Sequence, residues 1–441
     1  MSKAITSRPA VSREKQHGIH YTPLALAEAV ALRLAREIAP GTTKTKLVLA
    51  DTACGEGELL KALVDAIRAR GVMSALEVHA LDRDAEAIRA TSARLGIDGV
   101  DLHARCEDFL SSVAHQGSLF GSEKPVGLPP VDLLIANPPY VRTQVLGATE
   151  AQDLAARYGL AGRVDLAYPF AMSMIETVEA GGHFAIILSN KFLTIQAGAS
   201  FRGFLERETE ILEVWDLGDS RLFAAAVLPV VIFGRRARGG FRTGVPFRSL
   251  YEDRAAESES SVCGDADVLT RFAWSDASNR FAWKGATWNM RVGHLMVRPE
   301  SRIWLLDDGV DKRATRPKNT RTSVAWRDVL RTSVGIKTTA DNVFIRTAAE
   351  WRAMPDSVRP ERDLLHPVRL SNDVAPWCAP AADQLDHWVL YPFDMSSAKR
   401  KPIKLESYPG AAAYLELHRT QLEGRKYVIE GGREWFEPWV P

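Results

Sequence analysis

From residue 24 to residue 234, short apolar runs alternate with segments of helical periodicity. The periodicity predicts helices at 24–39, 59–70, 83–96 and near 165–180. The apolar runs predict strands at 46–51, 76–82, within 100–109, and at 131–136, 182–189, 210–217 and 227–234. This alternation favours an α/β fold, in which a parallel sheet has helices on both faces. Ligands of such sheets bind at the carboxyl ends of the strands.

Four polar motifs directly follow predicted strands, so we expect all four at one edge of the sheet. They are the glycine turn "TACGEGE" (52–58), Asp82 in "LDRD", Asp108 with Phe109 in "CEDF", and the "NPPY" loop. The glycine turn would let the backbone approach a ligand closely, although it matches neither the dinucleotide-binding pattern nor the phosphate-binding loop. An acid such as Asp82 typically accepts hydrogen bonds from ribose hydroxyls. Its ordinary alternative is a helix cap, a role that Asp84 fills better.

The "NPPY" loop, Asn137 to Tyr140, is the most specific of these motifs. Two consecutive prolines cannot donate to a sheet and fix their own φ angles, so they end the strand in a rigid loop. The Asn137 amide oxygen and the Pro138 carbonyl are two fixed acceptors, and Tyr140 is a flat surface for stacking. Together they suit the exocyclic amine of adenine, because accepting both N–H bonds favours a nucleophilic lone pair. A sulfonium methyl donor in the glycine turn would complete the reaction by in-line positioning.

These motifs, in this order, resemble those of the class I S-adenosylmethionine-dependent DNA methyltransferases of the adenine-N6 kind. The resemblance covers most of residues 17–235 and is closest to the gamma arrangement of the TaqI-like and Eco57I-like modification enzymes. It implies a Rossmann-like, seven-stranded methyltransferase sheet with helices on both faces. It also implies S-adenosyl-L-methionine as the cofactor and base flipping as the way to reach the target.

The resemblance assigns roles to individual residues. The family's N-terminal and glycine-loop motifs surround the methionine part of the cofactor, and here they match Tyr21, Thr22, Pro23, Asp51, Ala53, Cys54, Gly55 and Gly57. Asp82 matches the ribose-binding acid, and the adenine-binding positions match Asp108, Phe109 and, in "DLAYPF", Phe170. The catalytic loop matches Asn137, Pro138, Pro139 and Tyr140. Phe223 matches the aromatic residue that stacks on the flipped base opposite Tyr140, and its ordinary alternative is a core phenylalanine.

The sequence changes character after residue 235. Residues 235–254 are rich in arginine, and 311–370 hold more basic than acidic side chains, although the whole chain has a net charge of only +1. Local basicity among scattered tryptophans suggests a second domain that meets a polyanion, while a solvated α+β domain with a tryptophan core is an equal alternative. The resemblance implies that residues 1–235 are the catalytic domain and 236–441 an α+β target-recognition domain. The family's domain usually continues further, so we expect a compact or incomplete one.

Composition excludes several other classes. The four cysteines lie too far apart for a zinc cluster, and we expect reduced thiols and no metal site. No apolar run approaches the length of a membrane span and the N-terminus has no apolar signal region, so we expect a cytoplasmic protein without a membrane partner. Only 16 residues precede the first cofactor motif. We therefore expect any restriction endonuclease to be a separately encoded partner.

The function expected from the sequence is that of an adenine-specific, site-specific DNA methyltransferase. Its substrate would be the N6 amino group of an adenine flipped out of duplex DNA, and it would be the modification component of a restriction–modification or related defence system. Two alternatives stay open: a methyltransferase acting on RNA or on a protein glutamine, and a non-catalytic, methyltransferase-like DNA-binding subunit.

Overall fold

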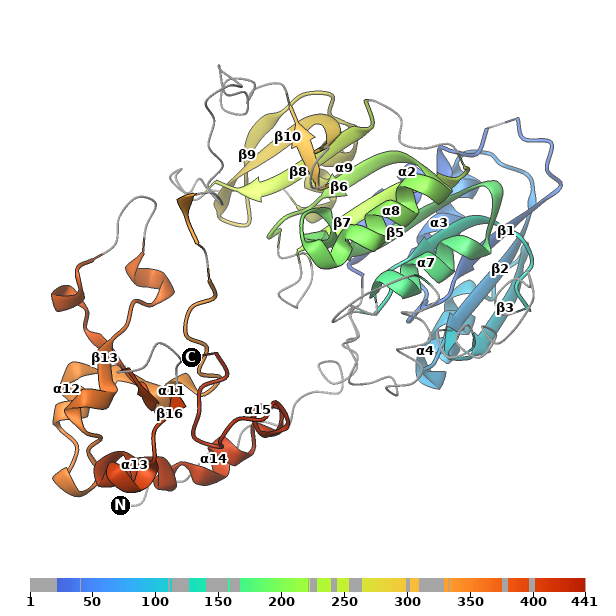
Figure 1. Ribbon diagram of the computed structural model, residues 1–441. Coiled ribbons are helices and arrows are strands. Elements are labelled where there is room, and N and C mark those ends of the chain that lie inside the picture. Colours follow the sequence, from blue (N-terminus) through green and yellow to red (C-terminus); the bar gives the residue numbers. More distant parts are fainter. Residues whose placement is uncertain are drawn as a thin grey trace. The chain divides into compact units, whose positions relative to one another are not determined.

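The structure is a computed structural model that describes residues 22–39, 41–109, 112, 127–139, 158, 167–220, 222, 228–238, 244–253, 264–298, 302–308, 329–331, 333–374, 380–395 and 401–440. The chain forms two compact units, Met1–Arg316 and Pro317–Pro441. Figure 1 shows both units, with helices and strands labelled where there is room.

The first unit is built on a large sheet that contains all seven predicted strands. They are β1 (Lys46–Asp51), β2 (Ala75–Asp82), β3 (Val100–Cys106), β4 (Val131–Ala136), β5 (Val178–Ser189), β6 (Thr209–Asp216) and β7 (Pro229–Arg236). Their order in the sheet is β3-β2-β1-β4-β5-β7-β6. Pairing is parallel from β3 through to β5, whereas β7 is antiparallel to both β5 and β6. The α/β fold with a methyltransferase-type sheet is therefore confirmed.

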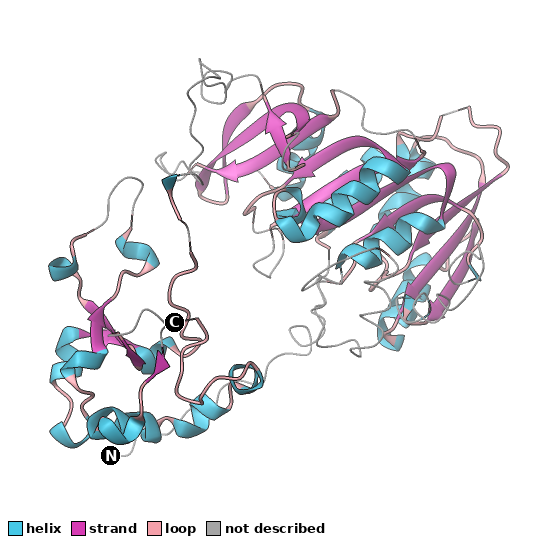
Figure 2. Cartoon of the chain, viewed as in Figure 1, coloured by secondary structure: helices cyan, strands magenta, loops and turns pink. Residues whose placement is uncertain are grey.

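Helices cover both faces of this sheet (Figure 2). They are α2 (Leu24–Ala35), α3 (Glu58–Ala69), α4 (Ala85–Leu95), α7 (Ala167–Thr177) and α8 (Ala199–Glu208). Alternate residues of β1 enter two separate cores, since side chains point to opposite faces of a strand. Leu47 and Leu49 pack with α2 and α3, while Val48 and Ala50 pack with α7 and α8. Among the helices that the structure describes, none is long and apolar enough to cross a bilayer.

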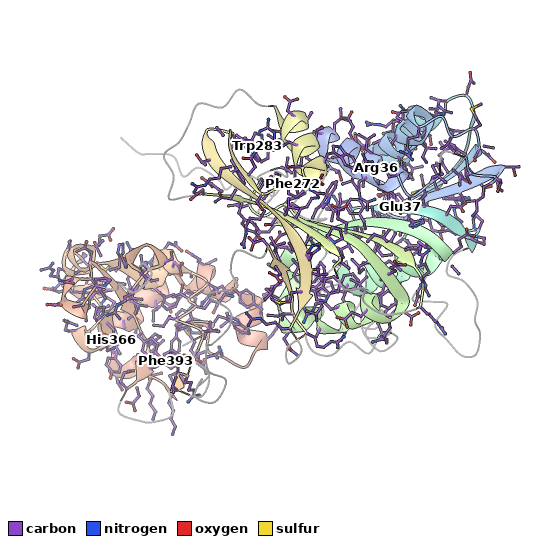
Figure 3. All side chains as sticks on the ribbon, turned by 90° about the horizontal axis from the view of Figure 1, so that it is seen from above. Arg36, Glu37, Phe272, Trp283, His366 and Phe393 are labelled. Carbon is purple, nitrogen blue, oxygen red and sulfur yellow. The ribbon has the colours of Figure 1, made fainter. Side chains whose placement is uncertain are left out.

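The first unit extends well beyond the boundary predicted after residue 235. Further elements are β8 (Pro246–Glu252), α9 (Asp265–Trp274), β9 (Asn279–Trp283), β10 (Ala286–Val297) and β11 (Trp304–Asp307). β8 pairs parallel to β6 and β10 pairs antiparallel to β8, so the sheet has eleven strands within the described part of the chain. Phe272 of α9 and Trp283 of β9 belong to the same core as α2 (Figure 3). Residues after 235 belong to the first unit because β8 covers the otherwise open edge of β6. The boundary between the two units lies at 316/317.

The second unit is a small α+β body with its own core. Its strands are β12 (Ile345–Thr347), β13 (Leu365–Pro367), β14 (His387–Leu390), β15 (Phe393–Asp394) and β16 (Lys401–Pro402). Its helices are α11 (Asp341–Phe344), α12 (Ala348–Arg352), α13 (Pro409–Leu417), α14 (Arg419–Glu423) and α15 (Lys426–Glu430). Short 3-10 turns lie at Asp356–Val358, Arg362–Leu364, Ser371–Asp373, Ala382–Gln384 and Leu405–Ser407. Trp351 and Tyr414 pack edge to face at 5.3 Å in the core.

Candidate active site

The carboxyl ends of β2, β1 and β4 are neighbours in the sheet, and three predicted site residues lie there. Asp82 ends β2, Asp51 ends β1, and Asn137 directly follows β4. Ala50 pairs with His79 on one side and with Leu134 on the other, so Asp82 and Asn137 each lie two positions further along the strand direction than Asp51. The structure therefore brings the glycine turn, the ribose-type acid and the NPPY motif to one edge, as the sequence predicts.

The glycine turn is fixed by contacts to its neighbours. The Gly55 N–H donates to Asp82 Oδ2 at 2.9 Å, and the Gly55 carbonyl accepts from Thr91 Oγ1 at 2.8 Å. Gly57 has φ of +82°, and a Cβ there would lie 3.0 Å from Thr91 Oγ1. Gly55 has φ of +53° but open space beside it. Both positions therefore require glycine conformations, and Gly57 requires a close approach as well.

Thr91 is a site residue that the sequence analysis missed. It lies inside α4, and its side chain is fully buried against the turn. A threonine within a helical pattern is ordinary, and the sequence holds no signal that its hydroxyl would reach a loop far away in the chain.

Asp82 holds the turn and still offers acceptor capacity. Its Oδ1 accepts from the Asp84 N–H and its Oδ2 from the Gly55 N–H, both at 2.9 Å. A carboxylate has about four lone-pair sites, so two backbone bonds do not saturate it. The helix-cap alternative is taken by Asp84, whose Oδ1 accepts from the Glu86 N–H at 2.8 Å. The cap of α4 is therefore Asp84, and the ribose-binding role of Asp82 stays a prediction.

Asp51 is a buried acid beneath the turn. Its side chain is only 1% exposed, and Oδ1 accepts from the Ala53 N–H at 2.9 Å. Burial raises the pKa of Asp51 to about 8, the Ala53 bond opposes this, and the charge of Asp82 adds to it. A ligand cation beside this carboxyl would favour its ionised form.

Cys54, in the same turn, is a packing residue. Burial first, and then the nearby charge of Asp51, raise the pKa of its thiol well above the usual range. It therefore stays neutral and unreactive.

Phe109 and Phe170, which the resemblance assigns to the adenine of the cofactor, are in contact with each other. Their ring centroids are 5.5 Å apart and the ring planes are inclined at 45°. Both rings are buried and belong to the core under α7. A flat base cannot fit between rings that touch at this distance. The two rings therefore cannot form the two sides of a sandwich around a base.

Asn137 is tied to the N-terminal motif. Every residue of β4 is buried, and the strand stops at the two prolines. Asn137 Nδ2 donates to Thr22 Oγ1 at 3.1 Å, and Thr22 is itself buried. Pro23 then starts α2 as its N-cap. The bond to Thr22 uses the amide nitrogen as donor, so Oδ1 is the acceptor atom of this side chain. Tyr21, Tyr140 and Phe223 lie outside the described residues.

One cluster elsewhere has ligand-type side chains. Glu77, His79 and His103 have ligand atoms within 4.8 Å of one another. The two imidazole rings are stacked at 4.7 Å with planes 9° apart, so their in-plane lone pairs do not converge on one point. Glu77 accepts from Lys46 at 2.5 Å and is bonded to His79 at 2.7 Å. These contacts account for the cluster, and we assign it no metal.

The chain is similar to known proteins, one of which matches 99% of its length. A family model described as Eco57I restriction-modification methylase matches residues 130–223, which include the NPPY loop. The type II methyltransferase M.BanIII of Aneurinibacillus aneurinilyticus is 36% identical over 446 residues, covering 99% of this chain and 76% of that protein. M.XhoI of Xanthomonas vasicola, also a type II methyltransferase, is 25% identical over 69% of this chain. The chain spans 52% of the length of M.XhoI.

A solved structure is also similar. The type I restriction-modification methyltransferase subunit from Streptococcus thermophilus aligns with 62% of this chain and 55% of its own, at 17% identity and a TM-score of 0.41. The family assignment rests on the 36% identity to M.BanIII, which extends over 99% of this chain. This chain belongs to the type II methyltransferases of restriction–modification systems, whose methyl donor is S-adenosylmethionine.

Proposed function

We propose that this methyltransferase modifies the N6 amino group of an adenine flipped out of duplex DNA. The observation that carries the proposal is the placement of Asn137 at the end of β4, next to the glycine turn that follows β1. When bound, S-adenosylmethionine supplies an electrophilic sulfonium methyl group. A planar amine held at Asn137 would lie beside that donor.

The described residues fit this cofactor. Asp51 is a buried carboxyl whose raised pKa a cationic ammonium group would lower again. The hydroxyl of Thr52 is buried and has no hydrogen-bond partner among the described residues, so a ligand atom can satisfy it. The space beside Gly55 is open to a close approach. We propose that Asp82 binds the ribose hydroxyls, and that Asp108, Phe109 and Phe170 hold the adenine of the cofactor.

The catalytic loop acts by accepting hydrogen bonds. Asn137 Oδ1 and the Pro138 carbonyl would accept the two N–H bonds of the target amine, which localises its lone pair for attack. Asn137 can do this only if its amide does not rotate, and the bond to Thr22 opposes rotation. Pro139 fixes the loop, and Tyr140 and Phe223 would stack on the two faces of the base. The catalytic residues that we propose are Asn137, Pro138, Pro139 and Tyr140. The substrate-binding residues are Tyr140 and Phe223.

Recognition of duplex DNA would come from the residues after 235. They comprise the strands β8 to β11 of the first unit and the whole second unit. Arginine and lysine contacts to phosphates would give affinity, and a few contacts to base edges would give sequence choice. A separately encoded restriction endonuclease, cutting the same sequence when it is unmodified, is the partner we propose.

The test is methyl transfer from labelled S-adenosylmethionine to mixed-sequence duplex DNA, with nucleoside analysis of the product. We expect N6-methyladenine from the unaltered protein. Asn137→Ala should lose transfer by at least about 100-fold while its affinity for the cofactor stays within about twofold, since Asn137 acts on the amine. Label in another base, in RNA or in a protein glutamine would refute the proposed substrate. Loss of cofactor binding in the variant would refute the role given to Asn137.

A further inference from the structure

Three polar side chains meet at the catalytic edge of the sheet, outside the site described above. Asn190 follows β5 and begins a 3-10 turn (Asn190–Leu193), Asp216 ends β6, and Tyr251 lies near the end of β8. The Tyr251 hydroxyl donates to Asp216 Oδ2 at 2.7 Å. Asn190 Nδ2 lies 3.1 Å from both Asp216 Oδ1 and the Tyr251 hydroxyl oxygen. We call these three residues the strand-end clamp.

The strand-end clamp bridges two strands that are not neighbours. β7 lies between β5 and β6, so the backbones of those two strands are about 10 Å apart. The main chain of β7 is held from both sides where it begins, because Asn190 N–H donates to the Leu228 carbonyl at 2.8 Å and Leu217 N–H to the Pro229 carbonyl at 2.9 Å. Side chains of Asn190 and Asp216 meet across this entry point. The clamp therefore fixes where the chain enters β7.

The same residues fix the other end of the segment that connects β6 to β7. Asp216 Oδ1 also accepts from the Gly218 N–H at 3.2 Å. Gly218 has φ of +50°, and a Cβ there would lie 2.9 Å from the ring of Tyr251 and 2.4 Å from the Leu250 carbonyl oxygen. This turn is thus seated directly on β8. Asp216 and Tyr251 thus contact the Gly218 end of the segment 217–228, and the Leu228 end is held by Asn190, whose side chain bonds them both.

Asp216 is suited to this task because it is buried and well supplied with donors. Its side chain has three of them, from Tyr251, Asn190 and Gly218. Burial raises the pKa of Asp216, and these bonds oppose the rise. A buried acceptor with neutral donors on three sides holds its geometry, since any displacement leaves a polar group unpaired.

We propose that Asn190, Asp216 and Tyr251 are positioning residues for the target base, because they set both ends of the segment 217–228. Phe223, which the sequence analysis assigns to stacking on that base, belongs to this segment. The inference rests on the proposed function. None of the three residues is assigned to the reacting atoms. They act through the segment, and the extension of the sheet by β8 contributes one of them.

Tyr251→Phe is the sharpest perturbation, since it removes one hydroxyl and keeps a ring that is already 40% exposed. Tyr158→Phe is the matched control in the same unit. Its hydroxyl bonds Ser173 at 2.7 Å and Glu176 at 2.8 Å, so the control also loses two hydrogen bonds. The control residue packs against Phe204 of α8, in the core that α7 and α8 share.

The first measurement needs no substrate. Hydrogen–deuterium exchange of the amides of Leu217, Gly218 and Ser220 should be about tenfold faster in Tyr251→Phe than in the unaltered protein, and unchanged in Tyr158→Phe. Equal exchange in the two variants would overturn the clamp. This result is independent of whether DNA is the substrate, so it separates failure of the clamp from failure of the proposed function.

The second measurement is steady-state methyl transfer to duplex DNA. Tyr251→Phe should lower kcat/KM for DNA by about tenfold, with the dissociation constant of S-adenosylmethionine within about twofold of the unaltered protein. Asp216→Asn, which keeps the shape but weakens the acceptor, should show the same split. Faster exchange without any change in kcat/KM would overturn the link to the target base. An equal loss of kcat/KM in Tyr158→Phe would show that both variants act through reduced stability of the whole unit, which would overturn the proposal.

Discussion

Asp51 makes the stability of the protein depend on pH in an unusual direction. Its pKa is about 8 in the folded protein, compared with about 3.9 for an unperturbed aspartate in an unfolded chain. Between these pH values the folded state holds a proton that the unfolded state has released. Stability due to this group is therefore greatest at low pH and is lost as the pH rises from about 4 to about 8. Most aspartates act in the opposite sense, because ion pairs lower their pKa.

The magnitude follows from the size of the shift. One pKa unit corresponds to about 1.4 kcal/mol, so the free energy of unfolding should fall by up to about 1.4 kcal/mol per pH unit across this window. The whole shift of about 4 units sets an upper limit of about 6 kcal/mol. Asp51→Asn has no titrating group and nearly the same shape. The difference in unfolding free energy between the two proteins isolates the effect, since all other groups cancel.

The assay has two parts, both on the full chain. Urea unfolding at pH 5, 6, 7, 8 and 9 should show the unaltered protein losing stability relative to Asp51→Asn up to about pH 8, with no further change above it. Calorimetric titration with S-adenosylmethionine at pH 7, in buffers of different ionisation enthalpy, should show release of about one proton per cofactor bound. We expect this release because the ammonium of the ligand ionises Asp51. The variant should release none.

A flat stability difference together with proton-neutral binding would refute this reasoning. It would show that Asp51 is already ionised in the cofactor-free protein. Stability that falls with pH but binding without proton release would have a narrower meaning. That result would support the raised pKa of Asp51, but it would show that Asp51 does not bind the ammonium group of the cofactor.

Two further predictions concern the proposed cofactor site. Phe170→Ala should weaken S-adenosylmethionine binding by about 1–3 kcal/mol, the scale of base–aromatic stacking, and calorimetry that finds unchanged affinity would remove Phe170 from the pocket. Gly57→Ala should destabilise the protein by about 1–3 kcal/mol and by more than Gly55→Ala, because both have positive φ but only Gly57 faces Thr91 at 3.0 Å. Denaturation midpoints that reverse this order would contradict the packing argument.

The sequence predicts the sheet well because its central strands are apolar throughout. All six residues of β4 are buried, which is the pattern of a strand covered on both faces. The helix α8 was missed, since its inward positions include Arg202 and Glu206. Arg202 is buried because it donates to the carbonyls of Phe192, Ile195 and Arg302. A periodicity argument cannot anticipate a polar side chain that finds its partners in other segments.

Pairing of polar side chains with distant segments also explains why the predicted domain boundary after residue 235 differs from the boundary at 316/317. The arginines of residues 235–254 suggested a surface for a polyanion, but several are paired within the first unit. Arg235 donates to Glu210 at 2.5 Å, and Arg248 donates to Glu213 at 2.7 Å. Both acids are buried in β6. The local excess of basic side chains is therefore balanced by acids that lie earlier in the chain, and these arginines belong to the first unit.

The strand-end clamp could not be predicted from sequence motifs. The glycine turn and the NPPY loop can be read from the sequence because each is contiguous and has its own backbone requirement. Asn190, Asp216 and Tyr251 each have an ordinary local explanation, as a turn residue, a strand-end acid and a strand aromatic. Only the strand order unites them, since β8 pairs with β6. A chain that ended at residue 235 would expose the edge of β6 and lose Tyr251. The extension is thus part of the first unit, and the role that we propose for the strand-end clamp depends on it.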